Sequence, residues 1–132
     1  HITELDDHVL AMESDSGNFG PTGFSFTGSQ DALQIMQEIG YVLLSPFGAG
    51  TIVAGGPSAD IAPLTAQGVP GASLNTVGSE DPGNPINAIY FYYHHTNADT
   101  ITHLNVTGVK NSVATFAITS YVVADMDQKL PR

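Results

Sequence analysis

The chain has 132 residues, of which 42% are hydrophobic, and includes 14 glycines and 8 prolines, which indicates one globular domain and not a disordered or fibrous protein. Three basic residues against 13 acidic ones give a formal net charge of −10, which disfavours nucleic acid as a partner because phosphates are repelled. The absence of cysteine excludes disulfides, thiolate metal sites and cysteine nucleophiles. No apolar run reaches the roughly 18 residues that a membrane span requires.

Residues 8–12 form a short apolar run, which predicts a strand buried on both faces. Acidic and small residues follow it at 13–17. Because open α/β sheets bind ligands beyond the carboxyl ends of their strands, Asp15 is a candidate ligand residue. The alternative is that Asp15 caps a turn.

Residues 18–28 are rich in glycine, proline and phenylalanine, which predicts a loop whose aromatic residues line a pocket or anchor the loop to the core. An amphipathic helix is predicted over 29–44, with Ser29 as its N-cap. A strand over 50–56 follows, and its glycines lack the spacing of a phosphate-binding loop.

Asp60 precedes a short predicted helix over 61–67, so it is either the N-cap of this helix or a carboxylate directed towards the same cleft as His95. Residues 71–77 predict another strand, and 78–85 predict a polar loop. This alternation of strands and helices indicates an α/β fold with parallel pairing where a helix intervenes.

The aromatic and β-branched run at 89–93 predicts a strand that delivers His94 and His95 to its end, a common position for metal ligands. If the strand continues through them, alternation allows at most one histidine to bind a given metal. Asp99 and Thr100 are candidates to accept a ring N–H of that ligand or to cap the next element. The alternative is a histidine pair bonded to the backbone.

Residues 106–128 predict a helix with a thin polar side, and therefore one packed on both sides, before a frayed tail over 125–132. Asn105 begins an Asn-Val-Thr sequon, which makes it a candidate glycosylation site if the protein is secreted. The chain begins at His1 without an initiator methionine or a signal-like segment, which we interpret as a sign of an incomplete chain.

Four motifs in order resemble the carboxypeptidase Q-like (plasma glutamate carboxypeptidase-like) co-catalytic zinc peptidases, a family that includes bacterial secreted aminopeptidases. The motifs are Met-Glu-Ser-Asp-Ser-Gly at 12–17, Ala-Gln-Gly-Val-Pro-Gly-Ala-Ser-Leu at 66–74, His-His-Thr-Asn-Ala-Asp-Thr at 94–100 and Ser-Tyr-Val-Val-Ala-Asp-Met at 120–126. The resemblance implies an incomplete three-layer α/β sandwich, with a mostly parallel mixed sheet flanked by helices. Residues 1–132 would then be the C-terminal portion of a single catalytic domain.

The resemblance also implies an active site with two Zn²⁺ ions, two histidines, a bridging aspartate, two further carboxylates and a general-base glutamate. On this chain Asp15 matches the carboxylate ligand of one zinc and His95 the histidine ligand of the other. Asp99 and Thr100 match the family pattern after the ligand histidine, as supporting residues, and Asp60 matches an aspartate near the cleft. His94, next to His95, is a further candidate for such a supporting residue.

The chain departs from the family in two respects. The His-x-Asp motif that supplies the bridging aspartate and the Glu-Glu pair that supplies the base are both absent from it. Two of five ligands cannot complete tetrahedral zinc sites, so we expect no catalytic residue in this chain and no activity from it alone.

The first hypothesis is a portion of a metallo-exopeptidase that hydrolyses dipeptides or small peptides, with the missing N-terminal half as partner, a homodimeric state, a secreted or lysosomal location and no membrane span. The second is a catalytically inactive interaction or binding domain derived from that fold. The third is a zinc-binding module that uses Asp15, His95 and either His94 or Asp60.

Overall fold

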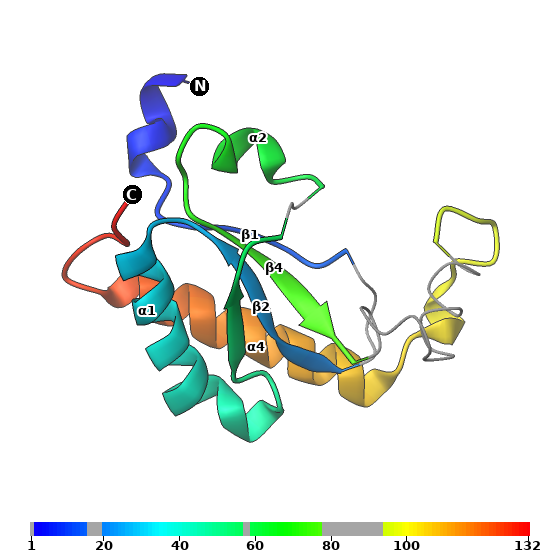
Figure 1. Ribbon diagram of the computed structural model, residues 1–132. Helices are drawn as coiled ribbons and strands as arrows, with labels where there is room; N and C mark the ends of the chain where they lie inside the picture. The colour runs from blue at the N-terminus through cyan, green and yellow to red at the C-terminus, as the bar shows by residue number, and fades with distance from the viewer. Residues whose placement is uncertain (1, 16–19, 57–58, 78–93) are drawn as a thin grey trace.

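The structure, a computed structural model, describes residues 2–15, 20–56, 59–77 and 94–132. In these ranges four strands form one sheet in the order β1–β4–β2–β3 (Figure 1). The strands are β1 (Ala11–Glu13), β2 (Pro21–Thr27), β3 (Thr51–Ala54) and β4 (Gly71–Thr76). β1 pairs with β4 and β2 with β3 in parallel, whereas β2 and β4 are antiparallel, so the sheet is mixed.

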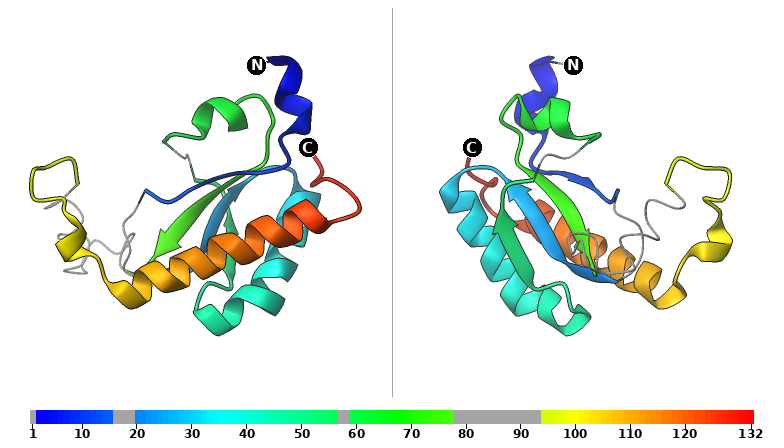
Figure 2. Two further views of the ribbon diagram at one scale, coloured as in Figure 1. Left: turned by 180° about the vertical axis from the view of Figure 1, so that it is seen from behind. Right: turned by 45° about the vertical axis from the view of Figure 1, so that its right-hand side comes forward.

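Two long helices, α1 and α4, pack on one face of this sheet, and the short α2 lies towards the other face (Figures 1 and 2). The α-helices are α1 (Gln30–Ile39), α2 (Ala62–Thr65) and α4 (Val106–Asp125). Short helical turns accompany them: η1 (Ile2–Asp7), η2 (Gly40–Leu44), η3 (Ser45–Phe47) and η4 (Ile101–His103). The α/β class and the mixed sheet flanked by helices are thus as predicted.

The largest correction concerns β2, because residues 21–27 were predicted to be a loop. Phe24 and Phe26 are 0% and 2% exposed and lie in the centre of the core between the sheet and the helices α1 and α4. Ser25 between them faces the opposite side, which is the alternation of a strand. The glycines and proline that indicated a loop lie instead in a strand that contains a bulge between Pro21 and Gly23.

The strand predicted over 8–12 also begins later than expected. Regular pairing starts at Ala11 and includes Glu13. Met12 is half-buried, so β1 is not enclosed on both faces by the residues that the structure describes. Within those residues β1 is an edge strand of the sheet.

The two faces of the sheet differ in polarity. Towards α1 and α4 the strands present a large apolar set: Phe24, Phe26, Ile52, Ala72 and Leu74. The opposite face carries small and polar side chains, among them Ser25 and Asn75, which share hydrogen bonds of 3.0–3.1 Å, and Ser73 and Glu13, which are bonded at 2.9 Å.

The prediction for α1 is confirmed. Ser29 is its N-cap, and its hydroxyl accepts a hydrogen bond from the Ala32 N–H at 3.2 Å. The buried residues follow the predicted period as far as Ile39: Ala32, Leu33, Met36 and Ile39. Beyond it the period predicted Val42 and Leu43 on the buried face, but these are 58% and 37% exposed, because the wider turn of η2 buries Leu44 instead. The helix continues through η2 and η3 and ends at Gly48, which adopts the left-handed φ of 78°.

The helix α4 buries small and hydroxyl-bearing residues against the sheet. These residues are Gly108, Ser112, Thr115, Thr119 and Val123. Val113 and Tyr121, by contrast, are 62% and 70% exposed, so the described residues cover only one side of a helix that was expected to be packed on both. Among the helices that the structure describes, none combines the length and the apolarity that crossing a bilayer requires.

The last residues of the chain, predicted to fray, instead hold η1 through a set of contacts that we call the C-terminal clasp (residues 129–132). The Lys129 Nζ donates to the Asp6 carbonyl at 2.5 Å, and Arg132 forms an ion pair with the Asp6 carboxylate at 3.2 Å. Arg132 also donates to the carbonyls of Leu5 and His8. Cations near the last carbonyls of a helical turn stabilise that turn. Because the clasp contacts η1, both ends of this chain lie on one side of the molecule (Figure 1).

We predict that Gly23→Ala disrupts the pairing of β2 with β3. A Cβ at Gly23, where φ is 145°, would lie 1.7 Å from the Thr51 carbonyl oxygen, so the strands have to separate. We expect the free energy of unfolding to fall by about 3 kcal/mol or more. Gly68→Ala is the control because Gly68 also has a positive φ but has open space around it, and strain alone costs about 1–2 kcal/mol. Equal losses in urea denaturation would contradict the steric argument.

A second prediction concerns the N-cap of α4. The Asn105 Oδ1 accepts a hydrogen bond from the Gly108 N–H at 2.8 Å, so Asn105→Ala should lower the free energy of unfolding by about 1 kcal/mol. Asn105→Asp keeps an accepting oxygen and should remain close to wild type, although it also removes the sequon. Urea denaturation of unglycosylated protein measures both variants, and a loss shared by Asp and Ala would argue against the cap.

Candidate functional site at the carboxyl end of β1

The two predicted metal ligands, Asp15 and His95, are both exposed. Asp15 follows β1 by two residues, and His95 lies in a turn that includes His94. The views in Figures 1 and 2 agree that the segment 94–100 lies at the end of the molecule where β1 and β4 terminate, away from the packed core. The predicted strand at 89–93 and the polar loop at 78–85 lie outside the described residues.

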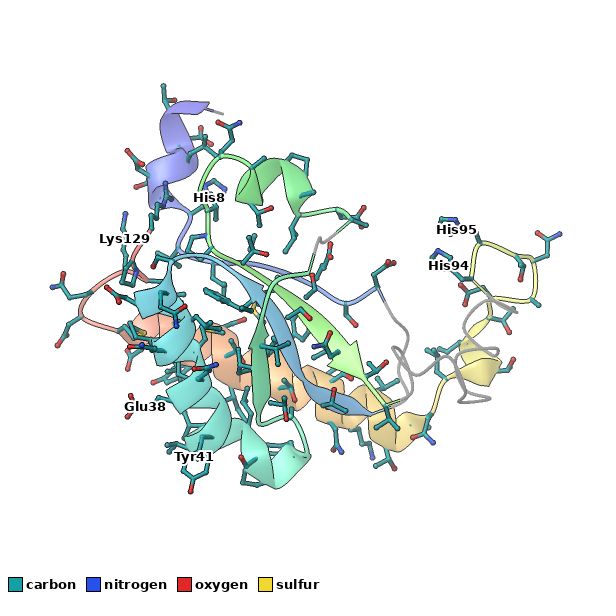
Figure 3. The ribbon with its side chains drawn as sticks, viewed as in Figure 1. His8, Glu38, Tyr41, His94, His95 and Lys129 are labelled. Carbon is teal, nitrogen blue, oxygen red and sulfur yellow. The ribbon has the colours of Figure 1, made fainter. Side chains whose placement is uncertain are left out.

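The histidine pair does not follow strand alternation. His95 adopts a positive φ of 57°, which turns the chain so that the two imidazole rings stack with centroids 3.8 Å apart and planes 21° from parallel. Both rings consequently project from the same side of the turn (Figure 3). A left-handed conformation is uncommon for a residue other than glycine, and such backbone strain is often found at functional positions.

The two residues proposed to support His95 take part in local contacts of the loop. The Asp99 N–H donates to the Thr96 carbonyl at 3.1 Å, and the Thr100 and Thr102 hydroxyls are 2.7 Å apart. Thr100 occupies the N-cap position of η4, but its side chain makes no capping hydrogen bond there. The prediction that Thr100 caps the next element is therefore wrong, and its role beside His95 stays a prediction.

The prediction that Asp60 is the N-cap of a short helix is wrong. The helix α2 begins at Ala62, its N-cap is Ile61, and that residue provides no capping side chain. A carboxylate from a residue far away in the sequence instead binds the main chain just before the helix. Asp60 contributes only its main-chain N–H and leaves its carboxylate exposed.

That distant residue is Glu13, the last residue of β1, which sequence analysis did not identify as part of a site. Its Oε2 accepts hydrogen bonds from the N–H groups of Asp60 and Ile61 at 2.9 and 3.2 Å. Its Oε1 accepts from the Ala59 N–H at 3.0 Å and from the Ser73 hydroxyl at 2.9 Å. The position of Glu13 directly after an apolar run was the available signal, but nothing local indicated its partners.

A groove of about 630 Å³ runs along α4 on the other side of β1. Its lining is mostly apolar or small: Ser14, Val109, Ser112, Val113, Phe116, Ala117 and Ser120. The Ser112 hydroxyl is buried and has no hydrogen-bond partner among the described residues. The groove therefore exposes apolar surface beside a polar atom that lacks a partner.

The described residues do not by themselves form a metal centre. Within 2–15, 20–56, 59–77 and 94–132 no group of three or more His, Asp or Glu side chains is arranged to hold a metal ion. Asp15 and His95 can contribute at most two ligands, whereas a structural or catalytic zinc needs three or four from protein.

The chain is similar to known proteins over its whole length, although no family model matches it. It is 39% identical over all 132 residues to carboxypeptidase Q from human and from mouse, and 36% identical to carboxypeptidase Q from Xenopus laevis. In each case it spans only 26% of the length of the relative. All of this chain is therefore related to about a quarter of those proteins.

A solved structure agrees with these sequence comparisons. The crystal structure of a peptidase M28 precursor from Shewanella amazonensis superposes on the whole of this chain with a TM-score of 0.76 and 31% sequence identity, over 28% of its own length. At this identity the likeness extends from the fold to the sequence. The chain is therefore carboxypeptidase Q-like throughout, with the fold of the corresponding part of an M28 peptidase.

Proposed function

We propose that this chain is part of a metallo-exopeptidase that hydrolyses dipeptides or other small peptides with zinc-activated water. The observation that carries the proposal is the unbroken similarity of all 132 residues to carboxypeptidase Q. Because the chain spans about a quarter of those relatives, the remaining ligands and the general base would come from polypeptide outside this sequence. A secreted or lysosomal location, a glycan on Asn105 and a homodimer belong to the same proposal and rest on the resemblance alone.

Within this proposal Asp15 and His95 each hold one of two zinc ions. Support comes from their position. Asp15 follows the carboxyl end of β1, where ligands bind in α/β proteins, and His95 lies in the segment 94–100 at the same end of the molecule. Carboxylate oxygen and imidazole nitrogen are common zinc ligands. Zinc bound there would supply an activated water and polarise the scissile carbonyl. The stacked His94 would restrict the orientation of the His95 ring.

The exposed surface of α4 supports a partner region supplied by further polypeptide. An α-helix that is apolar on both sides is normally covered on both. Here Val106, Val113 and Tyr121 are exposed, the groove lies beside them, and β1 is an edge strand among the described residues. A strand paired with β1 and a helix laid against α4 would cover these surfaces, which is what about three-quarters of additional sequence in the relatives can provide.

We expect the native polypeptide that carries this sequence to contain about two zinc ions per chain and to hydrolyse dipeptides. Asp15→Asn and His95→Ala should each remove one zinc and lower kcat/KM by at least about 100-fold. Loss of a group that only supports a metal ligand costs up to about 100-fold, and loss of the ligand itself should cost at least as much. Metal analysis by mass spectrometry and a dipeptidase assay provide the two measurements.

Asp127→Asn and His8→Ala are the matched controls for this experiment. They make the same substitutions at an exposed position after α4 and at a half-buried position after η1, away from the candidate site. They should keep zinc content and activity. A native polypeptide without zinc or activity would contradict the proposal and favour the alternative, an inactive interaction domain, for which the exposed side of α4 is the supporting observation.

The 132-residue chain alone should associate with itself and bind the dye ANS, because its exposed apolar surface lacks the proposed covering. The double variant Val113→Glu, Tyr121→Glu should shift the chain towards monomer in size-exclusion chromatography. Its melting temperature should change little, because both side chains are mostly exposed. A monodisperse wild-type chain that does not bind ANS would argue against an uncovered interface.

A further inference from the structure

The carboxylate of Glu13 joins three parts of the chain that are distant in sequence. It is the last residue of β1, and it binds the main chain of residues 59–61 and the side chain of Ser73 on β4. An ionised carboxylate offers about four acceptor positions, and here four donors occupy them. Hydrogen bonds to a charged group are about twice as strong as neutral ones, so these four bonds hold the three segments together strongly. We call this contact of Glu13 with residues 59–61 and Ser73 the junction.

The chain leaving β3 is held at two places on the polar face of the sheet. It first contacts β2, where the Gly55 N–H donates to the Phe26 carbonyl at 2.8 Å and the Thr27 hydroxyl donates to the Gly56 carbonyl at 3.1 Å. It is then held by Glu13 at residues 59–61. Glu13 is therefore the anchor that binds this connection to β1, at the opposite edge of the sheet from β3.

Alternation along β1, extended two residues past its end, predicts that Asp15 lies on the same face as this junction. Met12 faces α4, since its sulfur accepts a hydrogen bond from the Ser120 hydroxyl at 3.6 Å, and Ser14 lines the groove along α4. Ala11 packs with α2, and Glu13 faces the same way. Because Ser14 still follows this period, we expect Asp15 to point towards the Glu13 side.

We propose that Glu13 is a positioning residue for Asp15. This inference rests on the proposed function, in which Asp15 is a zinc ligand. Glu13 is the last residue with regular strand pairing before Asp15, so its four hydrogen bonds fix the main chain from which the ligand carboxylate projects. One of these bonds is to the Asp60 N–H, so they also hold the main chain of Asp60 near β1. Groups that orient a metal ligand without touching the metal commonly contribute 10- to 100-fold to metal affinity.

The experiment uses the native polypeptide, with Glu13→Gln as the test variant. The glutamine amide nitrogen cannot accept hydrogen bonds, so at least one bond to the main chain of residues 59–61 is lost while size is preserved, even where the nitrogen donates to the Ser73 hydroxyl. Glu38→Gln is the control, because it removes the same charge from the exposed side of α1, where Glu38 points away from the sheet (Figure 3). Hydrogen exchange of the metal-free protein and zinc affinity from chelator competition are measured on both variants.

For Glu13→Gln we expect faster amide exchange both at 59–61 and at 14–15, by roughly tenfold or more, the effect of losing a charge-assisted hydrogen bond. We also expect zinc affinity to fall by about 10- to 100-fold and kcat to fall more than KM changes. Ser73→Ala removes one of the four donors and should change the same quantities in the same direction by a smaller factor. Glu38→Gln should match wild type in all of them.

A purely structural role for Glu13 gives a different result. If exchange increases only at 59–61, or if the melting temperature falls while zinc affinity and kcat of the folded protein stay at wild-type values, the inference is wrong. Failure of the proposed function is recognised separately, because wild type itself would then lack zinc and activity. Exchange at 14–15 would still show in that case whether Glu13 fixes the main chain at Asp15.

Discussion

The alternation of side chains along the strands is the constraint from which the rest of the structure follows. It divides the sheet into an apolar face, covered by α1 and α4, and a face of small and polar residues. On the apolar face, burial of the two aromatic side chains of β2 holds both helices to the sheet. On the polar face the strands retain hydrogen-bonding groups, and one of them, the Glu13 carboxylate, organises the connection between β3 and α2.

Elements with strong local signals could be predicted from the sequence. The N-cap serine and the apolar period of α1 were sufficient, as were the β-branched and apolar runs of β3 and β4. The strand β2 was missed because Pro21 and Gly23 are typical of turns. Gly23 is needed for another reason, the close approach of the Thr51 carbonyl, and that contact depends on the packed sheet. Only the Phe-Ser-Phe alternation at 24–26 indicated a strand.

The candidate site was predictable where it depends on chain order and not where it depends on contacts across the fold. A carboxylate after a strand and a histidine near residue 95 could be recognised by type and position. Asp15 follows the end of β1, and the segment 94–100 lies at the same end of the molecule. Their roles as zinc ligands remain predictions. Glu13 could not be assigned partners, because its donors are 46 to 60 positions away. The stacking of His94 on His95 depends on the positive φ of His95, which no local sequence pattern predicts.

The C-terminal clasp bears on the order in which the chain folds. Arg132 and Asp6 are 126 positions apart, so their contact closes nearly the whole chain into a loop. Closure of so long a loop costs more entropy than any local step, and one exposed ion pair with a few exposed hydrogen bonds returns little of it. The clasp therefore forms only after α1 and the sheet have assembled, once the Ser29 hydroxyl can bind the Pro131 carbonyl at 3.0 Å and the Leu130 side chain has a core to enter. Residues 2–7 thus acquire a fixed place only after a segment more than 120 positions away has docked on the folded sheet and α1.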